Sequence, residues 1–493
     1  MVEVINGPPE CRYGVIRWMG HPKTEPSKLI AGLEMEEESS AFTDGRFGNE
    51  RCFTCPSNKA FFVFTHKLKR DSRFDESASF IERRDIVFIS FLRLHLRFSA
   101  FGAMACPDLE GDIPPPSAND LDRFLGQNKG IQGHHNSCYM DAMLFSMYSF
   151  SMVFDSILFR PKRSDDIKDY DKVQKVLRDG IVNPLRSNFF VRADKVLNLR
   201  KLLDKCSSVK GLMTEEKDPE EFLKSLLQET LKADPFIKLS SGQECFHYQL
   251  FMEKEESIVL PTTQQLLELS FLQSDIKLAK TPPCLILQMP RFGKTFKMYS
   301  RIVPSLRLDI TDIMLSYPRE CTICGRLASH ECQACYQHFG DSLDKIAFCA
   351  NCLKKSHSHS KRTNHSPRPL QIDPDYLQYY ESHPDASIAR EVLELFAVIC
   401  IATSHYVTFV KCGKGDDAPW VFFDSMADRM GTKHGYNVPE VQQCHFLPEW
   451  LKDEQRKKIC QISDDKQLPE QMRRLLCDSY ICMYQSPSLV HYQ

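Results

Sequence analysis

Three residues of types suited to thiol chemistry lie far apart in this sequence: Cys138, His405 and Asp424. A cysteine thiolate can attack a carbonyl carbon, a histidine can accept the thiol proton, and a carboxylate can hold the imidazole in the required orientation. Each residue alone is more often structural, because most of the 20 cysteines would be apolar fillers or metal ligands. The combination favours catalysis if the fold brings the three together.

Cys138 is predicted at the start of a helix over residues 139–150. Apolar residues recur there at helical spacing, at Met140, Met143, Leu144 and Met147. Asn136 or Ser137 can act as the N-cap. The unpaired N–H groups and the positive dipole end of the first turn favour a thiolate and can hold an oxyanion. The position of Cys138 therefore suits a nucleophile.

A β-hairpin is predicted to carry the other two residues. Residues 406–410 and 420–423 alternate like strands on either side of a turn-forming run. A hairpin folded symmetrically about residues 414–415 places His405 directly across from Asp424, with Cβ atoms about 5 Å apart. A carboxylate so placed can hold one imidazole nitrogen while the other accepts the thiol proton.

A second cluster has the spacing of metal ligands. Its three Cys-x-x-Cys pairs and two histidines are Cys321, Cys324, Cys332, Cys335, Cys349, Cys352, His357 and His365. Eight such ligands suffice for two tetrahedral Zn²⁺ ions with a structural role, and His359 could replace His357 by spacing. Disulfides are the alternative, but no secretory signal precedes the chain, so reduced thiolates on zinc are favoured. No catalytic cofactor is expected.

Composition restricts the remaining function classes. The chain has 493 residues, a formal net charge of −2 and a pI near 6.8, which gives no global attraction to nucleic acid or to anionic membranes. Residues 86–106 are apolar, but Arg93, His95 and Arg97 interrupt them, so a buried or partner-covered helix is expected and no membrane span is predicted. The length allows two or three domains.

The first residues predict a small β-barrel. Short strand patterns at 14–20, 29–35 and 52–64 are divided by turn residues, and Cys52 and Cys55 are interpreted as core positions on a strand. The expected domains are a β-rich unit at 1–74, a linker with a proline run at 75–127, a catalytic domain at 128–493 and a zinc module inserted in it at 318–370.

Several segments resemble the ubiquitin-specific protease family. Residues 130–144 are similar to its cysteine box, residues 395–409 to its histidine box, and residues 218–223 to the acidic box between them. Residues 285–292 complete the order of these boxes. The cylindromatosis-type (CYLD-type) branch of the family is the most similar, through residues 130–138, 289–294, 422–428, 473–478 and 483–487. The resemblance covers about residues 128–493.

This resemblance implies an α+β, papain-like catalytic domain with a B-box-like zinc module. In such a module the first and third cysteine pairs share one ion, and Cys332, Cys335, His357 and His365 hold the other. Asp218 would contact the basic, extended tail of ubiquitin. The wider family commonly carries an asparagine that helps form the oxyanion hole five residues before the nucleophile. Gly133 stands there, which leaves backbone N–H groups and Asn136 as candidate donors.

The N-terminal unit resembles a CAP-Gly domain, an SH3-like barrel. The residues that carry this resemblance are 14–20, 31–34, 43–45 and Phe53. The segment Ala41–Gly45 lacks the lysine and asparagine that normally contact acidic C-terminal tails, which argues against microtubule binding. Signalling adaptor proteins are the expected partners of this unit.

The resemblance therefore implies a cysteine deubiquitinase that acts on ubiquitin and polyubiquitin chains. It implies a preference for linear and lysine-sixty-three-linked chains and a dampening role in inflammatory (NF-kappa-B-type) signalling. A cytoplasmic location is expected, with perinuclear or cytoskeletal association as a variant. Two alternatives stay open: an inactive ubiquitin-binding scaffold or adaptor, and a papain-like peptidase unrelated to ubiquitin. The intact triad counts against the first, and the ordered boxes count against the second.

Overall fold

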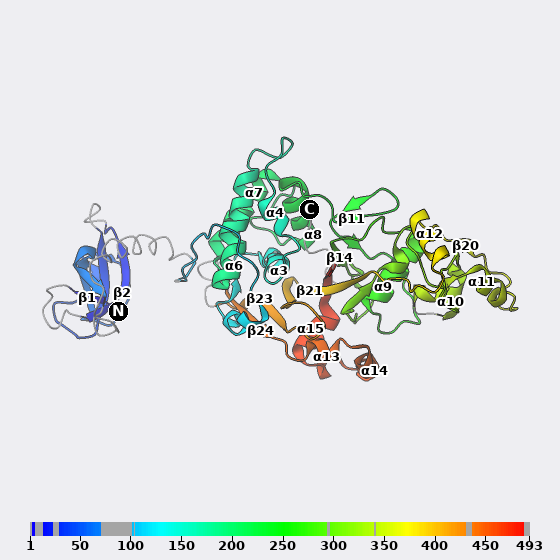
Figure 1. Cartoon of the computed structure of the whole chain (residues 1–493). Coiled ribbons are helices and arrows are strands. Elements are labelled where there is room, and N and C mark those ends of the chain that lie inside the picture. Colours follow the sequence, from blue (N-terminus) through cyan, green and yellow to red (C-terminus); the bar gives the residue numbers. More distant parts are fainter. Residues whose placement is uncertain are drawn as a thin grey trace. The chain divides into compact units, whose positions relative to one another are not determined.

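The chain divides into two compact units, Met1–Leu94 and His95–Gln493 (Figure 1). The computed structural model describes residues 2–4, 13–22, 29–70, 101–102, 104–292, 296–339, 342–429 and 436–487. Most of the apolar stretch 86–106, predicted to be a helix, lies outside these residues. Within the described ranges, no helix combines the length and apolar character that a membrane crossing requires.

The first unit is built around a five-stranded antiparallel sheet. Its strands are β1 (Val2–Val4), β2 (Tyr13–Gly20), β3 (Ile30–Met35), β6 (Ala60–Phe64) and β7 (Leu68–Arg70), in the order β6-β3-β2-β1-β7, with a separate hairpin of β4 (Arg46–Phe47) and β5 (Glu50–Arg51). The sheet buries a small apolar core that includes Leu33 and Val63. The strand expected from residue 52 is wrong at its start, because residues 52–55 form a loop and Cys52 and Cys55 are only partly buried there.

A mixed sheet organises the second unit. Its strand order is β13-β14-β25-β21-β22-β23-β24-β8, with β17 paired beside β21. The strands are β8 (Gly126–Gln127), β13 (Tyr248–Gln249), β14 (Cys284–Gln288), β17 (Arg307–Asp309), β21 (Val392–Ala402), β22 (His405–Lys411), β23 (Trp420–Asp428), β24 (Val438–Gln443) and β25 (Ser479–Gln485). The central strands are buried along nearly their whole length, because elements pack on both faces.

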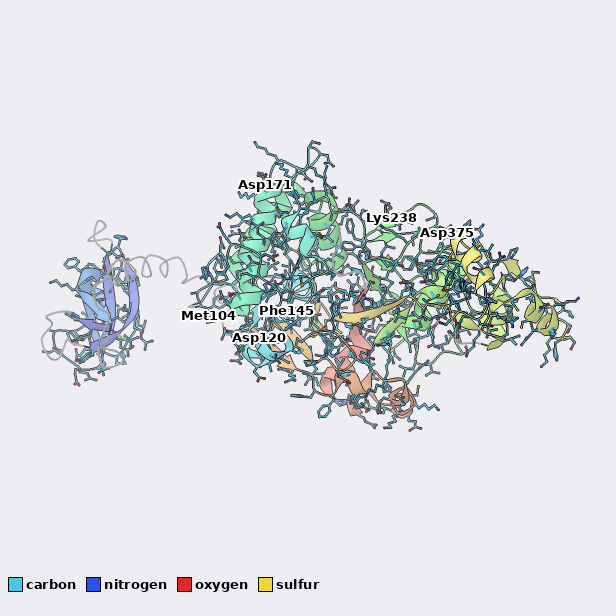
Figure 2. The ribbon with its side chains drawn as sticks, viewed as in Figure 1. Met104, Asp120, Phe145, Asp171, Lys238 and Asp375 are labelled. Atoms are coloured by element: carbon cyan, nitrogen blue, oxygen red, sulfur yellow. The ribbon has the colours of Figure 1, made fainter. Side chains whose placement is uncertain are left out.

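Helix α3 (Cys138–Tyr148) packs against β21, β22 and β23, and every one of its residues is buried. It begins one residue before the predicted helix and ends two residues earlier. The ring of Phe145 stacks on that of Phe423 with centroids 4.1 Å apart, which fixes the helix against β23 (Phe145 is labelled in Figure 2). Gly130 allows this approach, because a Cβ there would lie 2.4 Å from the Phe423 ring.

Other helices surround the sheet. They are α2 (Leu121–Phe124), α4 (Asp155–Phe159), α5 (Tyr170–Leu177), α6 (Asn183–Asn188), α7 (Ala193–Cys206), α8 (Pro219–Leu223), α9 (Thr263–Ser274), α13 (Leu447–Trp450), α14 (Asp453–Gln461) and α15 (Glu470–Asp478). Within the second unit, α6 and α7 lie on one side, and α10 (Gln333–Phe339), α11 (Ala350–His357) and α12 (Pro374–Ser382) gather at the opposite end (Figure 1). Strands β14 and β21 lie between these two groups of helices (Figure 1).

The segment that holds the predicted metal ligands is small. It contains β18 (His330–Glu331), β19 (Ala347–Phe348) and β20 (Arg368–Pro369) in one short sheet, with α10 (Gln333–Phe339) and α11 (Ala350–His357), and α12 (Pro374–Ser382) follows. Buried Arg319 attaches it to the rest of the unit. Its guanidinium pairs with Asp312 at 2.6 Å and Glu331 at 2.7 Å, and it donates to the Leu343 carbonyl. The predicted domain boundaries stay predictions.

Candidate active site

The hairpin that carries His405 and Asp424 forms with a different register from the predicted one. Lys411 pairs with Trp420, so the hairpin folds about the bond between residues 415 and 416 and is shifted by two residues. The prediction that His405 lies directly across from Asp424 is therefore wrong. Because side chains alternate with a period of two, an even shift leaves both on the same face of the sheet. They meet diagonally, with His405 Nε2 and Asp424 Oδ1 2.8 Å apart.

The imidazole of His405 is placed between two partners. Burial alone would lower its pKa, but the hydrogen bond with Asp424 and the interaction with the Cys138 thiol raise the pKa of His405 to about 9. Its Nδ1 is buried and has no hydrogen bond of good geometry among the described residues. With Nε2 bound to the carboxylate, Nδ1 is the atom free to exchange a proton with the thiol.

Cys138 lies buried at the first position of α3. Its Sγ lies 3.7 Å from the carbonyl oxygen of Ser404, the residue before the histidine. Ser137 occupies the N-cap position, for which Asn136 and Ser137 were the two predicted candidates. Its side chain makes no capping bond to the helix. The Ser137 hydroxyl instead accepts from the His134 N–H at 2.8 Å and donates to Asp141 Oδ2 at 2.6 Å.

The loop before Cys138 has an unusual backbone that a buried arginine holds in place. His135 and Asn136 have φ angles of 22° and 58°, in the left-handed region that costs free energy for residues with a Cβ. Arg200 of α7 donates from Nη1 to the His134 and His135 carbonyl oxygens at 3.1 and 3.0 Å, and from Nε to the Leu212 carbonyl at 2.6 Å. No motif marked Arg200, because its contacts depend entirely on tertiary structure.

The side chain of Asn136, a candidate oxyanion donor from the sequence, makes a different hydrogen bond in the structure. Its Nδ2 donates to the carbonyl oxygen of Thr214 at 3.0 Å. This bond ties the loop before Cys138 to residues 207–218, the segment that leads to Asp218. The backbone N–H groups at the start of α3 remain as the candidate oxyanion donors.

Asp218 lines a cavity that leads to the nucleophile. The cavity has a volume of about 540 Å³ and is also lined by Glu216, Glu221, Arg291, Phe296, Lys297, Ser404, Tyr406, Asp478 and Tyr480. Ser404 is the link to the sulfur of Cys138. Asp218 Oδ1 accepts a hydrogen bond of 2.6 Å from the hydroxyl of Tyr406, next to the catalytic-type histidine. Four carboxylates and the three cationic side chains of Lys217, Arg291 and Lys297 thus line this cavity.

A second cavity of about 420 Å³ lies beside Asp424, and Asp478 lines both cavities. Arg474 lines this second cavity and contacts the backbone of His405. Its Nη2 donates to the backbone carbonyl of His405 at 3.2 Å, and its Nη1 lies 3.4 Å from Asp478. The family resemblance included residues 473–478 but gave them no role. In the structure, Arg474 contacts the backbone of His405.

Comparison with known families places this geometry. The model of the ubiquitin carboxyl-terminal hydrolase family matches residues 129–435, a range that contains Cys138, His405 and Asp424, and the CAP-Gly domain model matches residues 2–68. The chain belongs to the ubiquitin carboxyl-terminal hydrolase family. The predicted α+β catalytic fold with an N-terminal CAP-Gly domain is confirmed.

Individual relatives agree with the family assignment. The chain is 44% identical over 502 residues to the ubiquitin carboxyl-terminal hydrolase CYLD of Homo sapiens, of Pongo abelii and of Mus musculus, each match covering 100% of this chain. The chain spans about half the length of these relatives, 50 to 51%. Among solved structures, the SAGA Ubp8/Sgf11/Sus1/Sgf73 DUB module bound to ubiquitin aldehyde matches with a TM-score of 0.37 and 11% identity, over 83% of this chain and 77% of that chain.

Gly133 is explained by the packing around it in this member of the hydrolase family. A Cβ at this position would lie 2.7 Å from the carbonyl oxygen of Ser425 and 3.2 Å from its hydroxyl oxygen. The backbone of β23 therefore leaves no room for the asparagine that the wider family commonly carries there. The departure noted in the sequence has a steric cause.

The metal-type residues of this hydrolase gather into two sets. The ligand atoms of Cys321, Cys324, Cys349 and Cys352 lie within 4.8 Å of one another, as do those of Cys332, Cys335, His357 and His365. His359, the alternative ligand by spacing, is not in the second set; its Nδ1 accepts from the Lys361 N–H.

The distances inside these sets fit tetrahedral zinc. Zinc–sulfur bonds of about 2.3 Å and zinc–nitrogen bonds of about 2.0 to 2.1 Å place two sulfurs about 3.8 Å apart and a sulfur and a nitrogen about 3.6 Å apart. Cys324 Sγ and Cys349 Sγ are 3.8 Å apart, and Cys335 Sγ is 3.5 Å from His357 Nε2 and 3.4 Å from His365 Nδ1. Both groups can hold a metal ion.

Proposed function

We propose that this chain is a cysteine deubiquitinase that hydrolyses isopeptide and peptide bonds at the C-terminus of ubiquitin. The observation that carries the proposal is the pairing of His405 with Asp424 at 2.8 Å beside a cysteine at the first turn of a buried helix. Membership of the ubiquitin carboxyl-terminal hydrolase family supports the substrate class.

In the proposed reaction, Cys138 Sγ attacks the carbonyl carbon at the end of the ubiquitin tail. His405 Nδ1 takes the thiol proton and returns it to the leaving amine, while a thioester forms between the tail and the sulfur. A water molecule, whose proton His405 accepts, then attacks the thioester and releases the ubiquitin carboxylate and the thiol. Asp424 holds the ring through Nε2 throughout, and N–H groups at the start of α3 bind the oxyanion.

The tail is proposed to lie in the cavity lined by Asp218. The carboxylates of Glu216, Asp218 and Glu221 suit the basic side chains of an extended tail, and the cavity leads past Ser404 to the sulfur. Asp218 would act while still bonded to Tyr406, whose hydroxyl fixes the orientation of the carboxylate.

The metal sets are proposed to hold two structural zinc ions, with no catalytic role. Linear and lysine-sixty-three-linked chains are the proposed substrates, the N-terminal unit is proposed to recruit signalling adaptors, and the proposed setting is cytoplasmic dampening of inflammatory signalling. These finer assignments rest on the resemblance to the CYLD-type branch.

The test is release of monoubiquitin from linear, lysine-sixty-three-linked and lysine-forty-eight-linked diubiquitin. The chain should cleave the first two, and Cys138→Ala should abolish cleavage. Cys460→Ala, an exposed cysteine on α14, is the matched control and should retain full activity. Binding of diubiquitin without cleavage by the unmodified chain would instead support a scaffold, and cleavage that survives Cys138→Ala would refute the mechanism.

A further inference from the structure

Arg291 is a buried arginine whose guanidinium group has no hydrogen-bond partner among the residues that the structure describes. It lies in β15 (Arg291–Phe292), its residue is 4% exposed, and its Nε, Nη1 and Nη2 all lack hydrogen bonds. Buried charged groups are normally paired and hydrogen-bonded, because an unmatched one costs several kcal/mol. Arg186 shows this rule in the same unit: its guanidinium binds Asp155 at 2.7 and 2.9 Å and three carbonyl oxygens.

The surroundings of Arg291 do not supply the missing partner. The carboxylate that affects it most is Asp478. Asp478 is already paired with Lys297 at 2.8 Å and with Arg474 at 3.4 Å. Three cations therefore share a single carboxylate at this end of the cavity, and Arg291 is the one left without a bond. Oxygen acceptors must come from outside the described chain.

Arg291 lines the same cavity as the three carboxylates proposed to face the ubiquitin tail. The cavity thus has a mainly acidic part with Glu216, Asp218 and Glu221, where Lys217 lies 3.7 Å from Glu221, and a basic part where Arg291 and Lys297 lie near Asp478. An extended basic peptide matches both parts, because its side chains carry positive charge and its backbone carbonyls carry exposed oxygen atoms. A guanidinium presents several N–H donors in a fixed plane that suits such oxygens.

We propose that the guanidinium of Arg291 binds backbone carbonyl oxygens of the substrate tail in this cavity. The affinity for ubiquitin then depends on the tail occupying the cavity. This inference rests on the proposed function and deepens it, since it assigns a recognition residue that the acidic box does not contain. Tail binding would supply the hydrogen bonds that the free enzyme lacks, so the desolvation of Arg291 is compensated only in the complex.

The test measures tail-dependent affinity in the inactive Cys138→Ala background. Dissociation constants are compared for ubiquitin and for ubiquitin lacking its last two residues, with and without Arg291→Met. The ratio of the two constants reports the contribution of the tail. We expect Arg291→Met to reduce this ratio by roughly tenfold or more, because a hydrogen bond to a charged group contributes about 1.5 to 3 kcal/mol, and Arg291→Lys to restore part of it.

Thermal unfolding separates this role from a structural one. Removing an unmatched buried charge is neutral or stabilising, so Arg291→Met should keep or raise the Tm of the free chain. Arg192→Met is the matched control: Arg192 is equally buried, at 4% exposure, but pairs with Asp194 at 2.6 Å and does not line the cavity. This variant should lower the Tm and leave the ratio unchanged.

The outcomes are distinct. An unchanged ratio in Arg291→Met, or equal weakening of both ubiquitins with a lowered Tm, would overturn the role of Arg291 and leave the proposed function standing. Failure of the Cys138→Ala chain with intact Arg291 to bind ubiquitin at all would instead remove the proposed function, and this inference with it.

Discussion

The proposed active site and the proposed metal-binding segment (residues 321–365) of the second unit position their side chains by different means. The metal-type residues all come from residues 321–365, and short elements bring them together. The active site combines α3 with β22 and β23, far away in the chain, and depends on hydrogen bonds and packing for its geometry. Local spacing can therefore define a ligand set, whereas a catalytic geometry needs the complete tertiary fold.

The largest effect should come from breaking the hydrogen bond that defines the catalytic side of this comparison. Asp424→Asn keeps the shape of the side chain but cannot stabilise an imidazolium at 2.8 Å in the same way. We expect kcat for ubiquitin release to fall by about 10⁴-fold, as it does when the carboxylate of a comparable triad is neutralised. Asp428→Asn, on the same strand, is the control and should leave kcat nearly unchanged. A fall of less than tenfold in Asp424→Asn would contradict the triad.

Arg200 tests whether the loop before the nucleophile also depends on tertiary contacts. Arg200→Met removes the two bonds to the His134 and His135 carbonyls that hold the left-handed backbone. The oxyanion donors would then lose their fixed orientation, so kcat should fall roughly 10- to 100-fold, with a smaller change in KM. Steady-state kinetics measure the split. A lowered Tm with unchanged kcat would assign Arg200 to stability alone.

The metal-binding segment should respond more weakly in catalysis and more strongly in its own folding. Of two nearby histidines, His357→Gln removes a member of a metal set and His359→Gln does not. The first variant should lose hydrogen-exchange protection over residues 321–365 and retain a few-fold reduced cleavage, because metal supplies much of the folding free energy of such a segment. The second should behave as the unmodified chain. Complete loss of cleavage in His357→Gln would show that Arg319 couples the two regions tightly.

The sequence allowed different parts of the two regions to be predicted. Seven of the eight metal-type residues followed from spacing, since the Cys-x-x-Cys pairs are local, whereas spacing left His357 and His359 as alternatives. The identity of Cys138, His405 and Asp424 followed from helical periodicity, a hairpin and family resemblance. The hairpin register did not, because a turn run with two glycines, Gly413 and Gly415, can close at more than one centre. The shift is even and only two residues long, so both side chains stay on the same face and within diagonal reach of each other.

What sequence reasoning missed shares one physical cause. Arg200 and Arg474 act through contacts with residues distant in the chain, such as the carbonyls of His134 and His405, and Arg291 lines a cavity formed by such residues. The resemblance covered Arg291 and Arg474 without giving either a role, and it did not mark Arg200. The steric exclusion at Gly133 depends on the backbone of Ser425, which lies on a strand nearly 300 residues away. Backbone carbonyls and close approaches of this kind do not depend on residue type, so no spacing rule could indicate them.

The smallest expected effect is a pH dependence of stability that belongs to the catalytic pair. The pKa of His405 is about 9 in the folded chain, since its bond to Asp424 and its interaction with Cys138 outweigh burial, against about 6.5 for an unfolded histidine. Its contribution to the free energy of unfolding is therefore fully present below about pH 6.5 and is lost as the pH rises toward 9. Urea unfolding across this window should show the decline.

Two carboxyls also contribute to that decline, so the comparison must be made against a variant. Burial raises the pKa of Asp141 to about 7 and that of Glu268 to about 8. The contribution of each carboxyl to the free energy of unfolding is therefore lost as the pH rises through these values. Because Glu268 lies outside both cavities and bonds to the N–H of Leu343, its part should persist in His405→Gln. The difference between the two curves isolates the histidine. Identical slopes between pH 8 and 9 would contradict a protonated His405 in the folded state, and with it the electrostatic coupling that separates the active site from the metal-binding segment.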